Sequence, residues 1–266
     1  MRSFDTPPAP GDMLALFASD LHLQESMPAT TAAFLHFLQH HAVKARQLYL
    51  LGDLFEYWAG DDDIDTPFYA GVVQALRAVS DNGTAIFWLG GNRDFLIGEG
   101  FAKATGATEL QDEAVIEIAG QPIVLVHGDA QCTDDMDYIA FRQQVRQPHW
   151  QANFLAQPLT QRKAIIDRMR EQSRAAQRNK TAQIMDVNQA AITRLFADSG
   201  ALRMIHGHTH RPASHATKIG GKHCVRVVLP DWDCDVGDVT KRRGGWLGIR
   251  GDGAWLRFDW DGQLLG

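Results

Sequence analysis

Five apolar segments of this chain each end in a short run of carboxylate, imidazole or amide side chains. The segments consist mainly of apolar, β-branched or aromatic residues, which favours β-strands, and they cover residues 13–19, 47–51, 84–89, 122–126 and 203–205. Open α/β sheets build their sites at the carboxyl ends of strands, because loops converge there while the sheet holds their bases rigid. The pattern therefore predicts an α/β fold with one polar site at the strand ends.

The polar runs that follow these segments carry the ligands that metal ions need. They read Asp-Leu-His at 20–22, Gly-Asp at 52–53, Gly-Gly-Asn-Arg-Asp at 90–94, His-Gly-Asp at 127–129 and His-Gly-His-Thr-His at 206–210. Asp20 and His22 are two positions apart, so at a strand exit they can lean to one side and share an ion. Oxygen and nitrogen ligands without a thiolate suit a hard or borderline divalent ion, with manganese first and iron or zinc as alternatives. Asp53 can bridge two ions about 3.5–4 Å apart, the spacing of two-metal hydrolases.

The five runs, in this order, resemble the signature of the calcineurin-like metallophosphoesterases, which reads DxH, GDxx, GNHD or GNHE, H and GHxH. The resemblance begins at about Met13 and covers most of the chain. It implies an α/β fold in which a two-sheet β-sandwich is flanked by helices and binds two metals. Carried over residue by residue, it assigns one metal to Asp20, His22, Asp53 and His210, and the other to Asp53, Asn92, His127 and His208.

Arg93 stands where most members of this family have a histidine that protonates the leaving alkoxide or helps to hold the transition state. An arginine stays protonated at working pH, so it can stabilise phosphoryl charge but is a poor general acid. A leaving phosphate, whose second pKa is about 6, needs no added proton, whereas an alcohol or a nucleic-acid sugar hydroxyl does. Arg93 thus favours a phosphoanhydride substrate over a phosphomonoester or a nucleic acid.

The Gly-Asn-Arg-Asp variant, with the stretches at 127–135, 184–188 and 204–212, resembles one branch of the family, the UDP-2,3-diacylglucosamine diphosphatases. This resemblance implies hydrolysis of UDP-2,3-diacylglucosamine to UMP and 2,3-diacylglucosamine 1-phosphate (lipid X) in lipid A biosynthesis. A hydroxide bridging two Mn²⁺ ions would attack the uridine-side phosphorus, with Asp53, Arg93 and His208 as catalytic residues. The implied location is peripheral, on the cytoplasmic face of the inner membrane, with no nucleic acid and no obligate protein partner.

Residues 135–186 interrupt the strand pattern, and their apolar side chains recur at roughly helical spacing. We expect a helical cap over the metals, and the resemblance implies that its apolar residues take acyl chains. Within it, residues 162–180 hold seven basic residues against two acidic ones, which indicates either a surface for a diphosphate and anionic lipid heads or an ordinary solvated helix face. Gln177 stands where the branch commonly has Asn. The implied substrate contacts are Asn92, Arg93, Asp135, Ser173, Gln177, Lys180 and His208.

The rest of the chain predicts one domain. Helices are expected at residues 30–44, 67–80 and 186–199, and strands at 114–118, 223–229, 246–249 and 254–260. With 266 residues and 45% hydrophobic content, the chain can bury a full core. We expect a flexible N-terminal tail over residues 1–12 and a metallophosphoesterase domain over 13–266 that includes the cap at 135–186. Three cysteines without CxxC spacing fit a reduced, cytoplasmic setting.

Three other features are read as structural. His36 and His40 are four apart, as in a zinc motif, but no Glu follows the first of them. His206 opens its run, but the family uses the two later histidines. The acidic residues at 61–65 are expected to form a solvated loop that caps a helix beginning at Pro67.

Three functions from different classes stay open on the sequence alone. The first is the diphosphatase of the acylated sugar nucleotide. The second is a soluble hydrolase of dinucleoside polyphosphates or nucleotide sugars with the same metals, which differs by not depending on acyl chains. The third is a non-catalytic scaffold, which absence of bound metal after reconstitution would favour.

Overall fold

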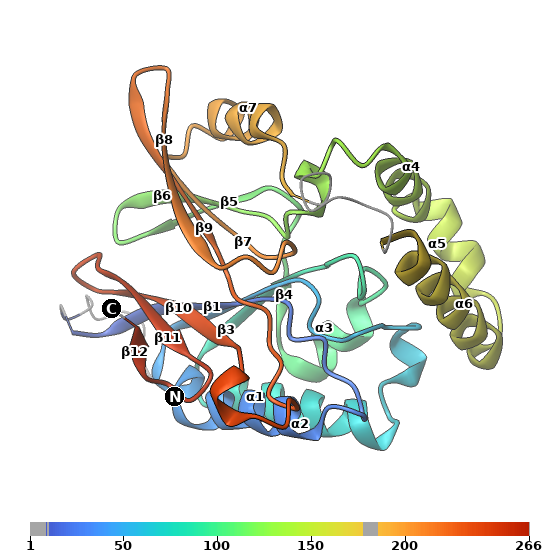
Figure 1. Ribbon diagram of the computed structural model, residues 1–266. Coiled ribbons are helices and arrows are strands. Elements are labelled where there is room, and N and C mark those ends of the chain that lie inside the picture. Colours follow the sequence, from blue (N-terminus) through green and yellow to red (C-terminus); the bar gives the residue numbers. More distant parts are fainter. Residues whose placement is uncertain (1–8, 10, 178–185, 266) are drawn as a thin grey trace.

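The computed structural model describes residues 9, 11–177 and 186–265, and two β-sheets packed face to face form its centre (Figure 1). The larger sheet has the strand order β12–β11–β10–β1–β2–β3–β4. Its strands are β1 Met13–Ala18, β2 Gln47–Leu51, β3 Ala85–Leu89, β4 Thr108–Glu109, β10 Gly245–Arg250, β11 Trp255–Asp259 and β12 Leu264–Leu265. Strands β1 to β4 run parallel, so their carboxyl ends lie at the same edge of the sheet.

The smaller sheet has the order β5–β6–β7–β9–β8. Its strands are β5 Ala114–Ile118, β6 Gln121–Leu125, β7 Arg203–His206, β8 Ala213–Ile219 and β9 Lys222–Val228. Buried side chains of both sheets form one core cluster, in which Phe17 and Tyr49 meet Ile123 and Ile205. The predicted two-sheet sandwich is therefore confirmed.

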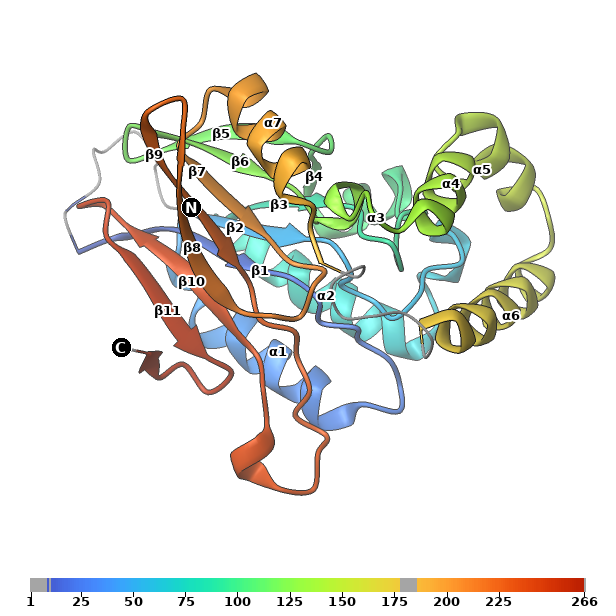
Figure 2. The same ribbon diagram turned by 45° about the horizontal axis from the view of Figure 1, so that its top comes forward.

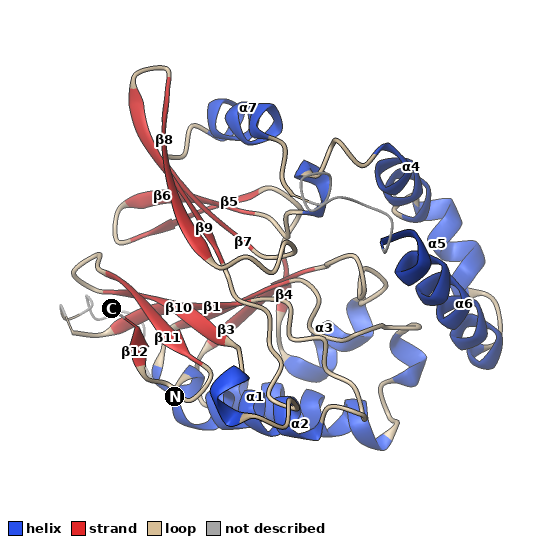
Figure 3. Cartoon of the chain, viewed as in Figure 1, coloured by secondary structure: helices blue, strands red, loops and turns tan. Residues whose placement is uncertain are grey.

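Helices cover the outer faces of both sheets (Figure 3). They are α1 Pro28–His40, α2 Pro67–Asp81, α3 Glu99–Thr105 and α7 Gln189–Ser199, and the short 3-10 turns are η1 Ala42–Lys44, η2 Asp61–Asp63, η3 Asp129–Gln131 and η4 Val239–Lys241. Phe34, Phe37 and Leu76 of α1 and α2 are fully buried in the second core cluster, beneath the larger sheet. Ile192 and Phe196 of α7 pack on Val124 of the smaller sheet. Both sheets are thus shielded on both faces at the strands that carry the polar runs.

Three further helices stand beside the sandwich, at the side where the polar runs lie (Figure 2). They are α4 Met136–Val145, α5 Pro148–Leu155 and α6 Leu159–Gln177, and they fall within the insertion predicted at 135–186. Trp150 and Phe154 of α5 stack with ring centroids 5.0 Å apart, and Phe154 is buried. Residues 178–185 and most of the predicted tail lie outside the described residues. Across the part of the chain that is described, none of the helices is both long and apolar enough to span a membrane.

The acidic run at 61–65 is not the solvated loop that we expected. Asp61 accepts hydrogen bonds from the Trp58 indole at 3.0 Å and from the backbone N–H groups of Gly98 and Gly100 at 3.1 and 2.7 Å. These bonds hold the start of α3. The residue that precedes α2 is Thr66, and no side chain caps that helix.

Two basic residues that we expected on a solvated or substrate-binding surface bind this acidic run instead. Arg162, whose side chain is 2% exposed, pairs with Asp62 and donates to the carbonyl oxygen of Ala59. Lys163 Nζ lies 2.7 Å from the buried carboxylate of Asp63. The expectation is wrong for both, because their charges neutralise carboxylates and dock α6 against the sandwich.

Candidate metal centre

The loops that leave β1, β2, β3, β6 and β7 meet at one place between the sheets. The backbone N–H groups of Asp20 and His22 donate to the carbonyl oxygens of Gly52 and Asp53 at 3.1 and 3.0 Å. Across the sandwich, the N–H of Gly207 donates to the carbonyl oxygen of His127 at 2.9 Å. Four of the predicted polar runs are thus joined by main-chain hydrogen bonds.

Five of the seven predicted metal ligands have a left-handed backbone. Their φ angles are 53° at Asp20, 48° at His22, 54° at Asp53, 66° at His208 and 53° at His210. Such values are uncommon outside glycine, and each typically costs about 1–3 kcal/mol. Among the described residues, the other non-glycine positions with positive φ are Glu113 and Ala119 alone. Backbone strain is concentrated where the side chains must be aimed at one another.

Two glycines in the polar runs allow the loops to approach so closely. A Cβ atom on Gly91 would overlap the carboxylate and backbone nitrogen of Asp53. A Cβ atom on Gly207 would overlap Asp20 Oδ2 and the Ser19 hydroxyl. These positions therefore need glycine for space, which explains why the polar runs contain it.

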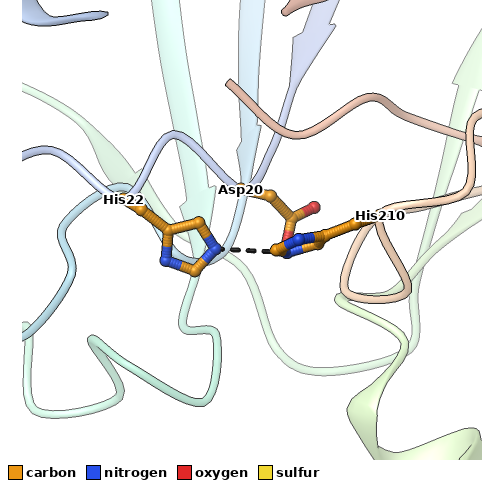
Figure 4. A group of neighbouring side chains, drawn as sticks. All are labelled: Asp20, His22 and His210. Carbon is orange, nitrogen blue, oxygen red and sulfur yellow. Dashed lines mark hydrogen bonds and ion pairs between the residues drawn. The ribbon is translucent and has the colours of Figure 1, made fainter. Parts of the chain in front are cut away.

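Asp20, His22 and His210 form one cluster of ligand atoms that all lie within 4.8 Å of one another (Figure 4). His22 Nε2 and His210 Nε2 are 3.2 Å apart, and His210 Nε2 is 3.4 Å from Asp20 Oδ1. Two imidazoles bound to one ion at about 2.1 Å would place their nitrogens roughly 3–3.4 Å apart. The cluster has the dimensions of a metal site.

A second cluster shares the Asp20 carboxylate with the first. Asp20, Asp53 and His127 offer ligand atoms within 4.8 Å of one another, and His127 Nε2 is 3.7 Å from Asp53 Oδ2. Asn92 Oδ1 lies 3.0 Å from His127 Nε2 and 2.8 Å from His208 Nδ1. Asp53 Oδ2 is also 3.8 Å from His22 Nε2, so one carboxylate reaches both clusters.

The Nδ1 atoms of two histidines each have an oxygen neighbour outside the clusters. His127 Nδ1 lies 2.9 Å from the carbonyl oxygen of Leu51, and His22 Nδ1 lies 2.9 Å from Glu56 Oε2. A proton held at Nδ1 beside these oxygens would leave Nε2 of a neutral imidazole, which faces the clusters, to bind a cation. The donor set of buried carboxylates, imidazoles and one amide fits a pair of divalent ions.

The pKa values of three groups at the clusters depart from their usual range. Burial opposes the charge on His127, but the carboxylates of Asp53, Asp20 and Asp129 raise its pKa to about 9. Burial raises the pKa of Asp94 to about 6, and the neighbouring Asp53 adds to the shift. Burial lowers the pKa of His208 to about 4, so its imidazole is neutral. The carboxylates of the second cluster thus favour a positive charge beside them.

Asp94 has a structural role that the sequence did not reveal. Its carboxylate accepts hydrogen bonds from the backbone N–H groups of Gly91 and Leu54 at 2.8 and 2.7 Å, and from that of Asp53 at 3.2 Å. It joins the loops that follow β2 and β3. The only hint of this role in the sequence was that Asp94 is the last residue of the Gly-Asn-Arg-Asp variant.

Asp129 and Glu56 are two further carboxylates that the sequence did not single out. Asp129 accepts hydrogen bonds from Tyr138 Oη at 2.6 Å and Arg142 Nε at 2.8 Å, so it fastens α4 to the loop after β6. Glu56 lies between His22 and Arg170 of α6. Both connect the cap helices to loops that carry predicted ligands.

A cavity of about 570 Å³ connects the clusters to the cap. Predicted ligands at its inner end are His22, Asp53, Asn92, His208 and His210. Its apolar wall comes chiefly from Phe95, Phe141, Trp150, Phe154, Ile166 and Met169. Polar ligands and an apolar chamber thus share one space.

The predicted substrate contacts divide into three groups. Arg93, Asp135 and Ser173 line the cavity. Gln177 is the last residue of α6, and its side chain is not described. Lys180 lies outside the described residues.

His206 points away from the clusters, as the sequence analysis expected. It is buried, with Nδ1 2.9 Å from the carbonyl oxygen of Gly207 and Nε2 2.9 Å from Arg226 Nη1. Burial lowers its pKa to about 3, and the Arg226 charge adds to the effect. It supports the turn that carries His208.

Comparisons with known proteins agree with this geometry. The sequence model of the family described as Calcineurin-like phosphoesterase matches residues 13–212. A protein of Aromatoleum aromaticum named UDP-2,3-diacylglucosamine hydrolase is 50% identical over 84% of this chain and 91% of its own length. Proteins of the same name from Cellvibrio japonicus and Stenotrophomonas maltophilia are 47% and 45% identical, over 83% and 88% of this chain and 91% and 97% of their own lengths.

Proposed function

Because this chain belongs to the calcineurin-like phosphoesterase family, we propose that it hydrolyses the diphosphate of UDP-2,3-diacylglucosamine to UMP and 2,3-diacylglucosamine 1-phosphate, a step of lipid A biosynthesis. Relatives at 45–50% identity are named for that substrate. The observation that carries the proposal is the single cavity in which the candidate metal clusters continue into an apolar wall. A substrate with a diphosphate and acyl chains matches both ends of it.

The apolar wall is what separates this substrate from an unacylated nucleotide sugar. Ligand pockets bury most of their ligand, and apolar lining is favourable when it covers apolar ligand surface. UDP-acetylglucosamine has no long chain to place beside Phe141, Trp150 and Met169, whereas a diacylated donor has two. We therefore favour the acylated donor over a soluble hydrolase of nucleotide sugars.

We propose Mn²⁺ as the ion of both clusters, because carboxylate, amide and imidazole ligands without sulfur suit it. The ligands would be Asp20, His22, Asp53 and His210 for one ion, and Asp53, Asn92, His127 and His208 for the other. When bound, such ions supply a nucleophilic water of lowered pKa and neutralise developing phosphoryl charge.

Arg93 would stabilise the charge on the diphosphate. Its backbone N–H donates to Asp53 Oδ1 at 2.8 Å, which fixes its position beside the shared ligand. Its side-chain Nε is buried and makes no hydrogen bond within the described structure. A phosphate oxygen of the substrate would satisfy this donor through a charge-assisted hydrogen bond. The departing sugar phosphate needs no proton, so an arginine suffices here.

The remaining substrate contacts would come from the ligand loops and the cap. Asp135 lines the cavity, and its side chain accepts a hydrogen bond from the N–H of Tyr138 at 3.2 Å, so its orientation is fixed at the start of α4. Ser173 lines the cavity from α6. We propose that these two, with Asn92, His208, Gln177 and Lys180, hold polar parts of the donor.

A diacylated substrate resides in a membrane, so we propose that the protein works as a peripheral enzyme on the cytoplasmic face of the inner membrane. Nucleic acid is not a substrate in this proposal, because Arg93, which stands where most relatives have a histidine, is a poor general acid for a leaving sugar hydroxyl. No obligate protein partner is part of it.

The proposal is tested by measuring UMP release from UDP-2,3-diacylglucosamine in mixed micelles with Mn²⁺. UDP-acetylglucosamine and a simple phosphodiester are run beside it. We expect a strong preference for the diacylated donor. Equal rates on the two nucleotide sugars would contradict the lipid substrate, and activity confined to the diester would keep the metal centre but discard the proposed substrate.

A further inference from the structure

One carboxylate joins the cap to a predicted metal ligand. Glu56 Oε1 lies 2.6 Å from Arg170 Nη2 of α6, and Glu56 Oε2 lies 2.9 Å from His22 Nδ1. All three side chains are about 14–15% exposed. Each oxygen of Glu56 thus has a different partner, one in the cap and one in the metal centre.

We propose that Glu56 is a positioning residue that couples the docking of α6 to the orientation of His22, so that the cap sets how tightly the His22 site holds its ion. This inference rests on the metal centre of the proposed function. Its physical basis is that a ligand histidine is oriented by the acceptor beside its other nitrogen, which strongly affects metal affinity. Here the Glu56 carboxylate is an ion-pair neighbour 2.9 Å from His22 Nδ1, and that nitrogen makes no hydrogen bond elsewhere in the described structure.

Arg170 contacts Glu56, Tyr57 and Asp167, and it also lines the cavity. Its guanidinium lies over the Tyr57 ring, 5.3 Å from the ring centre, and its other carboxylate neighbour, Asp167, is 3.8 Å away. The shortest ion pair that it forms is the one to Glu56. Because Tyr57 follows Glu56 directly, the arginine fixes both the carboxylate and the backbone segment that carries it.

The first turn of α6 is docked independently of this ion pair. Arg162 and Lys163 bind Asp62 and Asp63 near the amino end of the helix. Removing the Arg170 guanidinium therefore leaves the helix attached at these contacts while it releases Glu56. A change in metal affinity would then report the coupling and not the loss of the cap.

Thermodynamic linkage means that metal binding must also affect cap docking. If a docked cap strengthens metal binding at the His22 site, metal binding must strengthen cap docking by the same factor. The loaded enzyme would then hold its acyl-binding wall closer to the diphosphate site. Metal binding and formation of the substrate pocket would then be thermodynamically coupled.

The test is a Mn²⁺ titration of the full chain without substrate, in which free Mn²⁺ is measured by electron paramagnetic resonance. The variants are Glu56→Gln, Arg170→Met and their combination. The matched control is Arg168→Met, the same change at an exposed position of the same helix. Thermal unfolding of each metal-free variant checks that it is folded.

We expect Glu56→Gln to raise the dissociation constant of one of two Mn²⁺ equivalents by about 10–100-fold, as is typical for groups that orient a ligand. Arg170→Met should raise the same constant by roughly 3–30-fold, and the double variant should be no weaker than Glu56→Gln alone, because residues that act through one contact are not additive. Arg170→Lys, which keeps the charge, should recover most of the loss.

Two results would overturn the coupling. One is an Arg170→Met variant that binds Mn²⁺ like wild type and Arg168→Met. The other is a double variant whose loss equals the product of the single losses. Because no substrate is present, a wrong substrate assignment leaves this result unchanged, whereas a wild-type chain that binds no Mn²⁺ would overturn the metal centre and the coupling together.

Discussion

Asp20 and His22 show how single residues shape this centre. Each has a left-handed backbone that a non-glycine residue rarely adopts, and each sits where a buried parallel strand has just ended. Strain of this kind persists only where the surrounding structure over-determines the conformation. The hydrogen bonds from these two residues to the Gly52 and Asp53 carbonyls provide that constraint.

Removing a shared ligand should dismantle the centre. We expect Asp53→Ala, and likewise His127→Ala, to lower the rate of UMP release by at least about 10³-fold, because the loss of a ligand removes both the nucleophile and charge neutralisation. His36→Ala, at an exposed histidine of α1, should match wild type. Strong residual activity in either ligand variant, measured with its metal content, would contradict the two-metal assignment.

Arg93→Ala should slow the reaction without removing the metals. The guanidinium is a preorganised donor, and the loss of such a donor typically lowers the rate by about 10²–10³-fold. Mn²⁺ binding should stay close to wild type, since the Arg93 contact to Asp53 is made by the backbone. An unchanged turnover rate would show that Arg93 has a structural role only.

The residues that the sequence indicated and those that it missed differ in a physical way. Asn92, His127 and the histidines of the last run follow strands, so the pattern along the chain placed them at strand ends, and the family resemblance assigned them to metals. Glu56, Asp94 and Asp129 act through partners that are remote in the sequence, such as Arg170 and Tyr138. A pattern along the chain does not show such pairings.

At the scale of elements, sequence patterns predicted the helices of the cap but not the partners of its charged side chains. Helical spacing predicted that residues 135–186 form helices, and α4 to α6 lie there. The sequence pattern could not show which charged residues of α6 are paired and which face solvent, because Arg162 and Lys163 bind acidic residues about a hundred positions earlier in the chain. One member of each pair, Arg162 or Asp63, is buried, so part of the expected surface attaches α6 to the sandwich.

Phe141 provides a test of the apolar wall. We expect Phe141→Ala to raise the KM for the diacylated donor by roughly 5–30-fold, since removing apolar contact worth about 1–2 kcal/mol weakens binding by that factor. Turnover of UDP-acetylglucosamine should not change.

Met136→Ala is the matched control, because Met136 lies on the same helix, is 72% exposed and is outside the cavity lining. If Phe141→Ala affected both nucleotide sugars equally, the wall would not be the acyl-binding surface. Steady-state kinetics in mixed micelles of fixed composition makes the comparison.

At the scale of the whole molecule, the candidate centre lies between the two sheets. Asp20, Asp53 and Asn92 follow strands of the larger sheet, and His127 and His208 follow strands of the smaller one. Ions held by all of them would link the sheets. The global stability of the chain should therefore depend on metal.

We expect saturating Mn²⁺ in both sites to raise the unfolding midpoint by about 10–20 °C over the chelated protein. Metal at about 100 times its dissociation constant stabilises the folded state by roughly 2.7 kcal/mol per site, and a chain of this size shifts by about 2–4 °C per kcal/mol. Asp53→Ala should lose most of the shift. Calorimetry with and without a chelator measures it, and identical midpoints would contradict metal binding between the sheets.

The buried centre of the fold could be predicted from the sequence, whereas the strands at the sheet edges and the shortest elements could not. Continuous apolar runs predict buried strands such as β2 and β6. The family resemblance predicted that these strands form two sheets. Strand β8 was missed because it lies at the edge of its sheet and is largely exposed and polar, without the apolar alternation of a half-buried strand. The short helix α3 and the two-residue strands β4 and β12 give too few positions for a period.

Hydrolysis of UDP-2,3-diacylglucosamine in ¹⁸O-labelled water, with mass spectrometry of both products, tests the proposed reaction most directly. The account predicts one ¹⁸O atom in the phosphate of UMP and none in 2,3-diacylglucosamine 1-phosphate, because attack occurs at the uridine-side phosphorus. Label in the sugar phosphate would contradict the proposed direction of attack, and the absence of both products would contradict the diphosphatase itself.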